Sequence, residues 1–213
     1  MPMRLNETTR AYFDKLATIS PPDRAARYRA LLSPAPAASV AQYLAENEPQ
    51  HNSMLRTSVV PTMLKAGVGV NVIPSEAEAT FDVRALPDED IPRFFEDLKR
   101  LIDDPAVKIV PITTNLRPAG TSRLDTEMYR ALEHVSAAMY PGATVLPTMS
   151  TGATDMAQLR AKGIASYGIG PASTESDTVN YGAHSDVERL LETSLYSLVE
   201  FTWRATMEVA ARK

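Results

Sequence analysis

A short stretch in the later half of the chain holds residue types that can do chemistry. It contains a turn of small residues, Gly152-Ala153-Thr154, followed by Asp155 and a helical pattern. Backbone amides at a helix start can hold a carboxylate or an oxyanion. The same residues can also form no more than a turn and a helix cap. The layout of residues 147–188 is typical of an α/β site, whose loops lie at the carboxyl ends of strands.

His184 is the histidine of this stretch. It lies in a loop rich in Ser, Thr, Asp and Gly, just before a long amphipathic segment. Imidazole is a common metal ligand, but a lone loop histidine is usually solvated or a helix cap, and spacing alone favours that structural interpretation. Zinc needs three or four protein ligands, so one histidine cannot hold it catalytically.

Two earlier polar residues are candidates for substrate binding. Arg84 lies on the polar side of a predicted strand, where it can pair with Asp82 or Glu78. A guanidinium group is also the side chain best suited to grip a carboxylate with two hydrogen bonds. Asn71 follows a glycine turn and can be a simple turn residue. For Arg84 the residue pattern alone favours the surface ion pair.

The elements that position these residues form a first region, predicted as residues 1–118. Proline-separated helices are expected at residues 5–19, 24–32 and 39–46. Residues 55–64 and 76–86 are predicted strands, and the alternation in the second strand predicts that its apolar side is half-buried. Asp90 and Pro92 suit the start of a helix with an apolar stripe from Ile91 to Ile102. With a third strand at 107–112, this is most of a split βαβ, ferredoxin-like unit.

The second region is predicted as residues 119–213, after a proline-containing linker. A helical stripe covers residues 124–139, and short apolar runs at 143–147 and 164–169 are predicted strands. The last helix is expected from about Ser185 to Ala211, with a buried face formed by Val187, Leu191, Leu195 and Leu198. The predicted fold class is therefore α/β: an α+β first region of ferredoxin-like type followed by part of an α/β domain.

Composition excludes several classes of protein. The net charge is −4 and there is no long basic run, so the sequence shows no basic patch of the kind that binds nucleic acid. Nothing approaches the length of a transmembrane helix, and charges throughout residues 1–16 are unlike a signal peptide. The chain has no cysteine, so disulfides and thiolate ligands are excluded. A cytoplasmic location is expected if Met1 is the true start, and a periplasmic or secreted one is open if an N-terminal part is missing.

Several motifs together resemble the zinc carboxypeptidase, aminoacylase and desuccinylase family of metallopeptidases (peptidase M20). The resemblance covers nearly the whole chain but only the later half of the family's usual length. The family's last metal-ligand motif and its Gly-Gly-Thr-Asp-like turn have counterparts here, although Ala153 replaces the usual second glycine. The matching segments are Asn71-Val72-Ile73-Pro74, Phe81-Asp82-Val83-Arg84, Gly152-Ala153-Thr154-Asp155 and His184-Ser185-Asp186-Val187-Glu188-Arg189.

The resemblance implies a role for each candidate residue. His184 would be the last metal ligand, and Asn71 and Arg84 would contact the substrate, commonly across a homodimer formed by the lid. Gly152, Ala153 and Thr154 would bind substrate through backbone amides. The family uses two zinc ions, further His, Asp and Glu ligands and a glutamate base in a Glu-Glu pair. This chain has no Glu-Glu dipeptide and no second His-x-Asp in the right context.

The sequence thus predicts a C-terminal part of a zinc-dependent hydrolase that cleaves an amide or peptide bond next to a free carboxylate. The substrate would be a small N-acyl-amino acid or peptide. The isolated chain is expected to be inactive and to bind zinc weakly, because most ligands and the base are absent. The alternative is a non-catalytic dimerisation or ligand-binding module that uses the lid sheet.

Overall fold

The chain forms two compact units and combines helices with a small antiparallel sheet in unit 1, which confirms the predicted fold class. The structure is a computed structural model that describes residues 1–33, 38–112, 117–118, 120–171 and 185–211. Unit 1 consists of Met1–Thr121 and Leu146–Ala153, and unit 2 of Ser122–Val145 and Thr154–Lys213. Among the described residues, none of the helices combines the length and apolar character that crossing a lipid bilayer requires.

Unit 1 begins with a group of short helices. Three of them were predicted: α1 (Glu7–Ile19), α2 (Pro22–Leu31) and α3 (Ala38–Asn47). The fourth, α4 (Pro49–Met54), was not. A capping box fixes the start of α1, because the Asn6 side chain accepts from Thr9 N and the Thr9 hydroxyl accepts from Asn6 N, both at 2.9 Å. Pro22 stands at the first position of α2, where its missing N–H costs no hydrogen bond.

These helices enclose a well-packed core. Its large side chains are fully or almost fully buried: Phe13, Tyr28, Leu31, Leu44 and Leu55. Burying each such side chain stabilises the fold by about 1.5–3 kcal/mol before entropy is counted. The helices of unit 1 therefore have a hydrophobic core of their own.

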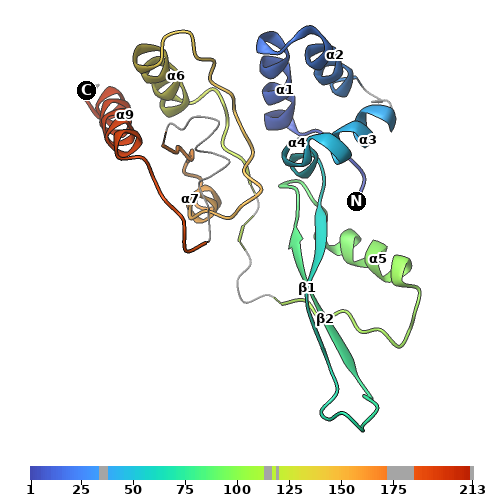
Figure 1. Ribbon diagram of the computed structural model, residues 1–213. Helices are drawn as coiled ribbons and strands as arrows, with labels where there is room; N and C mark the ends of the chain where they lie inside the picture. The colour runs from blue at the N-terminus through green and yellow to red at the C-terminus, as the bar shows by residue number, and fades with distance from the viewer. Residues whose placement is uncertain (34–37, 113–116, 119, 172–184, 212–213) are drawn as a thin grey trace. The chain divides into compact units, whose positions relative to one another are not determined.

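A long β-hairpin extends from this group of helices (Figure 1). Strand β1 (Ser58–Ala66) pairs antiparallel with β2 (Ala77–Arg84), from Ser58 opposite Arg84 to Ala66 opposite Ala77. The register shifts between Pro61 and Met63. Proline has no N–H to donate to a ladder, so it is tolerated in a strand mainly at an edge or a bulge.

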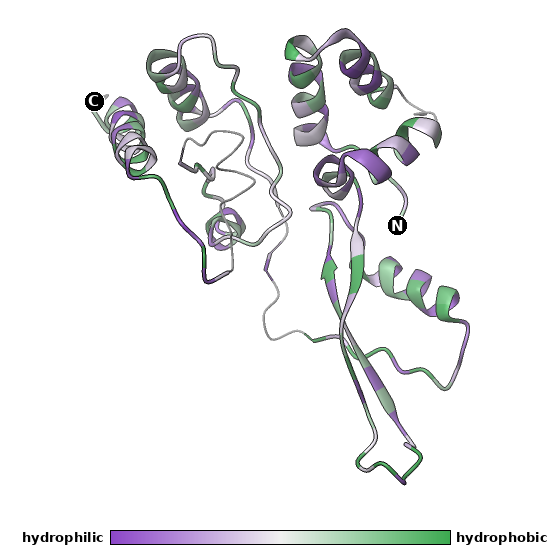
Figure 2. Ribbon diagram, in the orientation of Figure 1, coloured by the Kyte–Doolittle hydropathy of each residue, from purple (hydrophilic) through white to green (hydrophobic). Residues whose placement is uncertain are grey.

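The hairpin corrects two predictions. Strand β2 was expected to be a half-buried strand, with its apolar face covered, yet seven of its eight residues are exposed, including Phe81 (50%) and Val83 (40%) on that face. Residues 107–112 were expected to form a third strand and do not. A segment forms a strand only where a neighbouring strand pairs with its backbone hydrogen-bonding groups. Among the described residues β1 and β2 pair only with each other, so residues 107–112 have no strand partner. Figure 2 shows hydrophobic residues along this open hairpin and its tip.

The base of the hairpin is tied to the N-terminus by a small polar cluster. The buried Thr57 hydroxyl donates to the Glu89 carboxylate and accepts from Leu86 N at 3.1 Å. Glu89 also accepts from Arg4 Nη2 at 3.0 Å, and Arg4 N donates to Leu55 O at 2.7 Å. These bonds join the chain before β1 to the chain after β2.

Helix α5 (Ile91–Ile102) follows β2 and lies beside the hairpin (Figure 1). Asp90 caps it as predicted, by accepting from Arg93 N at 3.0 Å. Phe94 is buried, whereas Ile91, Leu101 and Ile102 are exposed. The apolar stripe of α5 is therefore only partly covered within the described chain.

Unit 2 is built on α6 (Glu127–Met139) and α9 (Glu192–Ala210), which pack together, and on the short α7 (Met156–Ala161). Three predictions here are wrong. Residues 143–147 and 164–169 form no strands, the last helix begins at Glu192 and not near Ser185, and the predicted buried face is exposed at Val187, Leu191 and Leu195. The buried residues of α9 are Ser194 and Ala205, and Leu198 and Phe201 on the same face are half-buried.

Candidate functional site

Arg84 and the Gly152 turn, both predicted for substrate binding, lie close together in unit 1. Arg84 ends β2, and its Nε donates to Asp82 Oδ2 at 2.8 Å. Its Nη1 donates to the carbonyl of Thr151 at 2.7 Å, which places the guanidinium one residue from Gly152. Gly152 N in turn donates to Ser150 Oγ at 3.1 Å. The segment is also held at Met149, whose sulfur lies 3.4 Å from Asn6 Nδ2.

This arrangement suits a carboxylate ligand. The Arg84 side chain is 56% exposed, and its two hydrogen bonds leave donors on both terminal nitrogens. The predicted ion pair with Asp82 is present, so the structural and functional interpretations of Arg84 are compatible. An exposed ion pair of this kind adds little stability, which leaves Arg84 able to exchange partners at small cost.

Ala153 and Thr154 complete the predicted turn. Ala153 is exposed, and the Thr154 carbonyl accepts from Ala157 N at 3.3 Å. Asp155 stands at the N-cap position of α7, without a side-chain capping hydrogen bond. Because α7 has only six residues, its dipole contributes little to holding an anion. Any anion binding at this turn would depend on its backbone amides and on Arg84.

Asn71 lies far from Arg84 in the same chain. It belongs to the loop that joins β1 and β2 at the tip of the hairpin, whereas Arg84 lies at the base, opposite Ser58 (Figure 1). The eight residues of β2 alone span about 24 Å at roughly 3.3 Å per residue. One chain therefore cannot place both side chains on one small substrate.

His184, the predicted metal ligand, lies outside the described residues. Within the described ranges no group of three or more His, Cys, Asp or Glu residues is placed to hold a metal ion. Described residues of its motif, Asp186 and Glu188, are exposed. The described residues thus do not fit a zinc centre.

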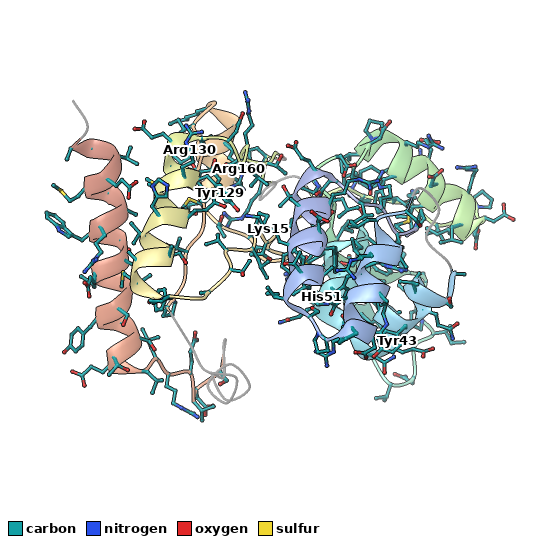
Figure 3. All side chains as sticks on the ribbon, turned by 90° about the horizontal axis from the view of Figure 1, so that it is seen from above. Lys15, Tyr43, His51, Tyr129, Arg130 and Arg160 are labelled. Atoms are coloured by element: carbon teal, nitrogen blue, oxygen red, sulfur yellow. The ribbon has the colours of Figure 1, made fainter. Side chains whose placement is uncertain are left out.

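A polar cluster in the N-terminal helices was not predicted. His51 Nδ1 lies 2.5 Å from Glu48 Oε2, and His51 Nε2 lies 3.0 Å from the Tyr12 hydroxyl. Tyr28 donates to the same Glu48 oxygen at 2.9 Å, and the His51 ring contacts the rings of Tyr12, Phe13 and Tyr28. Figure 3 labels His51 within these helices. The spacing of Glu48 and His51, three residues apart, was the available sequence signal.

This cluster is placed to support the fold. Burial, and then the charge of Glu48, raise the pKa of the Tyr12 hydroxyl. The pKa of Tyr28 is also raised, first by burial and then by its hydrogen bond to Glu48. Raised tyrosine pKa values make the hydroxyls poor nucleophiles at neutral pH. The network joins α1 and α2 to α4, which leads directly into β1.

A cavity in unit 2 lies beside α6 and α9 and contains none of the predicted site residues. Its lining is Glu127, Arg130, Ala131, His134 and Glu208. His134 Nδ1 lies 2.7 Å from Glu208 Oε1, an exposed pair that links the two helices.

The hairpin followed by α5 has the arrangement of a protein-association domain, with its apolar side chains turned outward. Residues 24–110 match the family model described as a peptidase dimerisation domain. This match bears out the resemblance that the motifs indicated, over the region of the expected dimerisation domain.

Several curated proteins have sequences similar to this chain. Probable carboxypeptidase S-like 2 of Dictyostelium discoideum is 31% identical over 108 residues, which are 51% of this chain and 21% of that protein. N-fatty-acyl-amino acid synthase/hydrolase PM20D1 of Xenopus tropicalis is 26% identical over 157 residues, 73% of this chain and 30% of that protein. Mouse aminoacylase-1 is 32% identical over 119 residues, 54% of this chain and 28% of that protein.

The chain thus spans less than a third of the length of these relatives. No solved structure matches it significantly.

Proposed function

We propose that this chain is the dimerising and substrate-gripping part of a metal-dependent hydrolase that cleaves an amide or peptide bond next to a free carboxylate. The relatives are named as a carboxypeptidase, an N-fatty-acyl-amino acid synthase/hydrolase and an aminoacylase. Peptides and N-acyl-amino acids share a terminal carboxylate. The observation that carries the proposal is the exposed Arg84 guanidinium beside the Gly152 turn.

In this proposal each residue has a distinct role. Arg84 binds the substrate carboxylate with its planar fork, a contact worth about 1.5–3 kcal/mol. The amides of Gly152 and its neighbours orient the same end of the substrate. Asn71 binds the scissile carbonyl and steadies the developing oxyanion. The zinc ions and the general base that the resemblance implies are assigned to other parts of the hydrolase, with His184 as this chain's own candidate ligand.

The separation of Asn71 and Arg84 within one chain supports an arrangement in which these two contacts come from two protomers. Asn71 and Arg84 of one chain are separated by the length of the hairpin, about 24 Å or more. A carboxylate and the adjacent scissile carbonyl of one substrate are only a few ångströms apart. Each site of a homodimer would therefore combine Arg84 of one protomer with Asn71 of the other.

Mixing two variants tests this arrangement in a hydrolase assembled from this chain and the metal-binding part of a relative. Arg84→Lys and Asn71→Ala homodimers should each be slow. After subunit exchange, half of the dimers are mixed, and each mixed dimer has one site with both native residues. Activity should recover toward about a quarter of the wild-type value. No recovery, with exchange demonstrated by mass spectrometry, would place both residues in one protomer or outside the site.

The second candidate is a dimerisation module without catalysis, and the lack of a metal-ligand cluster among the described residues favours it. Dialysis of the isolated chain followed by elemental analysis separates the two. We expect weakly held zinc and no hydrolysis by the isolated chain under either proposal. Activity that appears only when the metal-binding part of a relative is added supports the hydrolase. Tightly held stoichiometric zinc and peptidase activity lost in His184→Ala would show that this chain is sufficient by itself.

A further inference from the structure

The loop that joins β1 to β2 presents large apolar side chains to solvent on both sides of Asn71. We call residues 67–76 the tip loop, and Figure 2 shows hydrophobic residues at this end of the hairpin. Each of its large apolar side chains is at least 50% exposed: Val68, Val70, Val72 and Ile73. Such a concentration of exposed apolar side chains is characteristic of a binding surface, whereas single scattered ones are ordinary.

Backbone geometry and hydrogen bonding give the tip loop a defined shape. Gly67 has a φ of 76°, in the left-handed region that residues with a Cβ rarely adopt. Val72 N donates to the carbonyl of Gly69 at 3.2 Å, which closes a four-residue turn. Val70 and Asn71 are the two central residues of this turn. The Asn71 amide is therefore presented beside an apolar side chain that is fully exposed.

The two ends of the hairpin differ in charge. Between Lys65 and Glu76 no residue is charged, and the polar side chains of that segment are those of Asn71 and Ser75. At the base, the exposed Arg84 guanidinium carries a positive charge. In the proposed homodimer, each substrate would thus meet a cation from one protomer and an uncharged, largely apolar loop from the other.

The group on the carbonyl side of the scissile bond distinguishes N-acyl-amino acids from dipeptides. That group is bonded directly to the carbonyl carbon, so the neighbours of Asn71 border it when Asn71 binds the carbonyl. In a dipeptide the next carbon carries an α-ammonium group, and an unpaired cation among apolar side chains is strongly disfavoured. An uncharged apolar acyl chain is instead favoured in proportion to the apolar area that it buries.

We propose that the tip loop selects the acyl group, so that the preferred substrates are N-acyl-amino acids with an apolar acyl chain and not dipeptides with a free amino group. This rests on the proposed function, because it takes Asn71 as the contact to the scissile carbonyl in the partner protomer's site. Val70, beside Asn71 in the turn, borders the first carbons of the chain. Val68 and Ile73 extend this surface, so a long acyl chain buries more apolar area than an acetyl group.

Substrate preference tests this selection in the hydrolase assembled from this chain and the metal-binding part of a relative. The probes are N-decanoyl-leucine, N-acetyl-leucine and leucyl-leucine, which share the same free carboxylate. We expect kcat/KM to be highest for N-decanoyl-leucine, by at least about ten-fold over N-acetyl-leucine and by more over leucyl-leucine.

A charge placed in the turn should change this preference. Val70→Asp should remove most of the advantage of N-decanoyl-leucine, because its carboxylate would be desolvated beside the acyl chain. It should also improve leucyl-leucine relative to both acyl substrates, because a carboxylate can pair with the α-ammonium group. Val107→Asp, which changes a half-exposed valine outside the tip loop, is the matched control and should leave the ratios of kcat/KM unchanged.

The other outcomes overturn the inference in distinguishable ways. Equal kcat/KM for the three substrates, or ratios unaffected by Val70→Asp, reject the tip loop as the acyl-binding surface and leave the proposed function standing. If Val70→Asp abolishes the dimer in sedimentation equilibrium, the tip loop belongs to the interface between protomers. If the intact chain cosediments with phosphatidylcholine vesicles and Val70→Asp prevents this, the tip loop binds a lipid surface. Failure of the dimeric wild-type hydrolase to cleave any of the three substrates counts against the proposed function, and the inference falls with it.

Discussion

The N-terminal helices and the β-hairpin of unit 1 differ in how their apolar residues are covered. In the helices, Phe13, Leu31 and Leu44 are completely buried. In the hairpin, two residues of β1 and one of β2 are partly buried, and all other strand residues are exposed. Both regions are nevertheless rich in large apolar side chains, and the helices lead directly into the hairpin in the sequence.

The buried apolar residues of the helices stabilise the monomer, whereas the exposed apolar residues of the hairpin are free to contact another protein. An isolated two-stranded hairpin is marginally stable in water, and an exposed strand edge is a template for pairing with another copy. The hairpin is instead held at its base by Thr57, Glu89 and Arg4. Its apolar side chains are thus available to a partner protomer because the fold does not need them.

A pair of phenylalanine substitutions should give the largest contrast between the two regions. Phe13→Ala should lower the free energy of unfolding by about 3–5 kcal/mol, because it leaves a cavity in a closed core. Phe81→Ala should change monomer stability by less than about 1 kcal/mol, because half of that side chain is already exposed. Urea denaturation followed by circular dichroism measures both. Equal losses would show that the hairpin face is covered in the monomer.

A charge placed on the hairpin should act on assembly and not on folding. Leu64 is 83% exposed, so Leu64→Asp should leave the thermal midpoint of the monomer nearly unchanged. It should raise the dimer dissociation constant by roughly ten-fold or more, if the side chain is buried between protomers. Sedimentation equilibrium at several concentrations measures this, with the helix substitution Arg29→Ala as an exposed control. A wild-type chain that is monomeric at micromolar concentration contradicts the model of lid dimerisation.

A conservative substitution at the hairpin base should affect substrate binding alone. In the assembled hydrolase, Arg84→Lys keeps the charge but loses the planar fork. We expect kcat/KM for free-carboxylate substrates to fall about ten-fold, since each 1.4 kcal/mol is about ten-fold. Amidated substrates should be poor for both proteins and similarly so. If Arg84→Lys slows both substrate types equally, Arg84 does not bind the substrate carboxylate and is only an ion-pair partner of Asp82.

The smallest expected effect concerns pH and the helical core. Burial, the hydrogen bond to Glu48 and the Glu48 charge raise the pKa of Tyr28 above its ordinary value. The neutral hydroxyl is therefore favoured in the folded state. Its contribution is fully present below about pH 10 and is lost as pH rises further, because the unfolded chain ionises first.

Tyr28→Phe should cost about 1 kcal/mol at pH 8 through the lost hydrogen bond. The difference from wild type should narrow between about pH 10 and pH 11. Urea unfolding of the wild-type chain and of Tyr28→Phe across this pH range measures the difference. A constant difference at all pH values would show that the Tyr28 hydroxyl titrates normally in the folded chain.

The sequence predicted elements whose signals are local. Asp90, Pro92 and the apolar repeat of α5 located that helix, and the runs flanking Gly67 located both strands of the hairpin. It failed where the outcome depends on partners distant in the sequence. Residues 107–112 and 164–169 have strand composition but no neighbouring strand within the described chain. The face of α9 was misassigned in part, because Leu191 and Leu195 are exposed whereas Leu198 is half-buried.

The same limit applies to the candidate site. Motif resemblance selected both Arg84 and Asn71, and composition alone would have left both as surface residues. Nothing in residue spacing shows that a hairpin separates them, since 13 positions in sequence are compatible with contact or with wide separation. Only the antiparallel register, with Arg84 at the base, determines that they are apart.

Among the described residues, the hydrogen bonds of the buried Thr57 hydroxyl hold the hairpin at its base. The hairpin can therefore rotate about this base as one arm. For an arm of about 24 Å, a rotation of about 10° at the base moves the tip by roughly 4 Å. That displacement exceeds the length of a hydrogen bond. The position of Asn71 at the tip therefore depends on Thr57, Glu89 and Arg4 at the base of the hairpin. These three residues can have this effect without contacting a substrate.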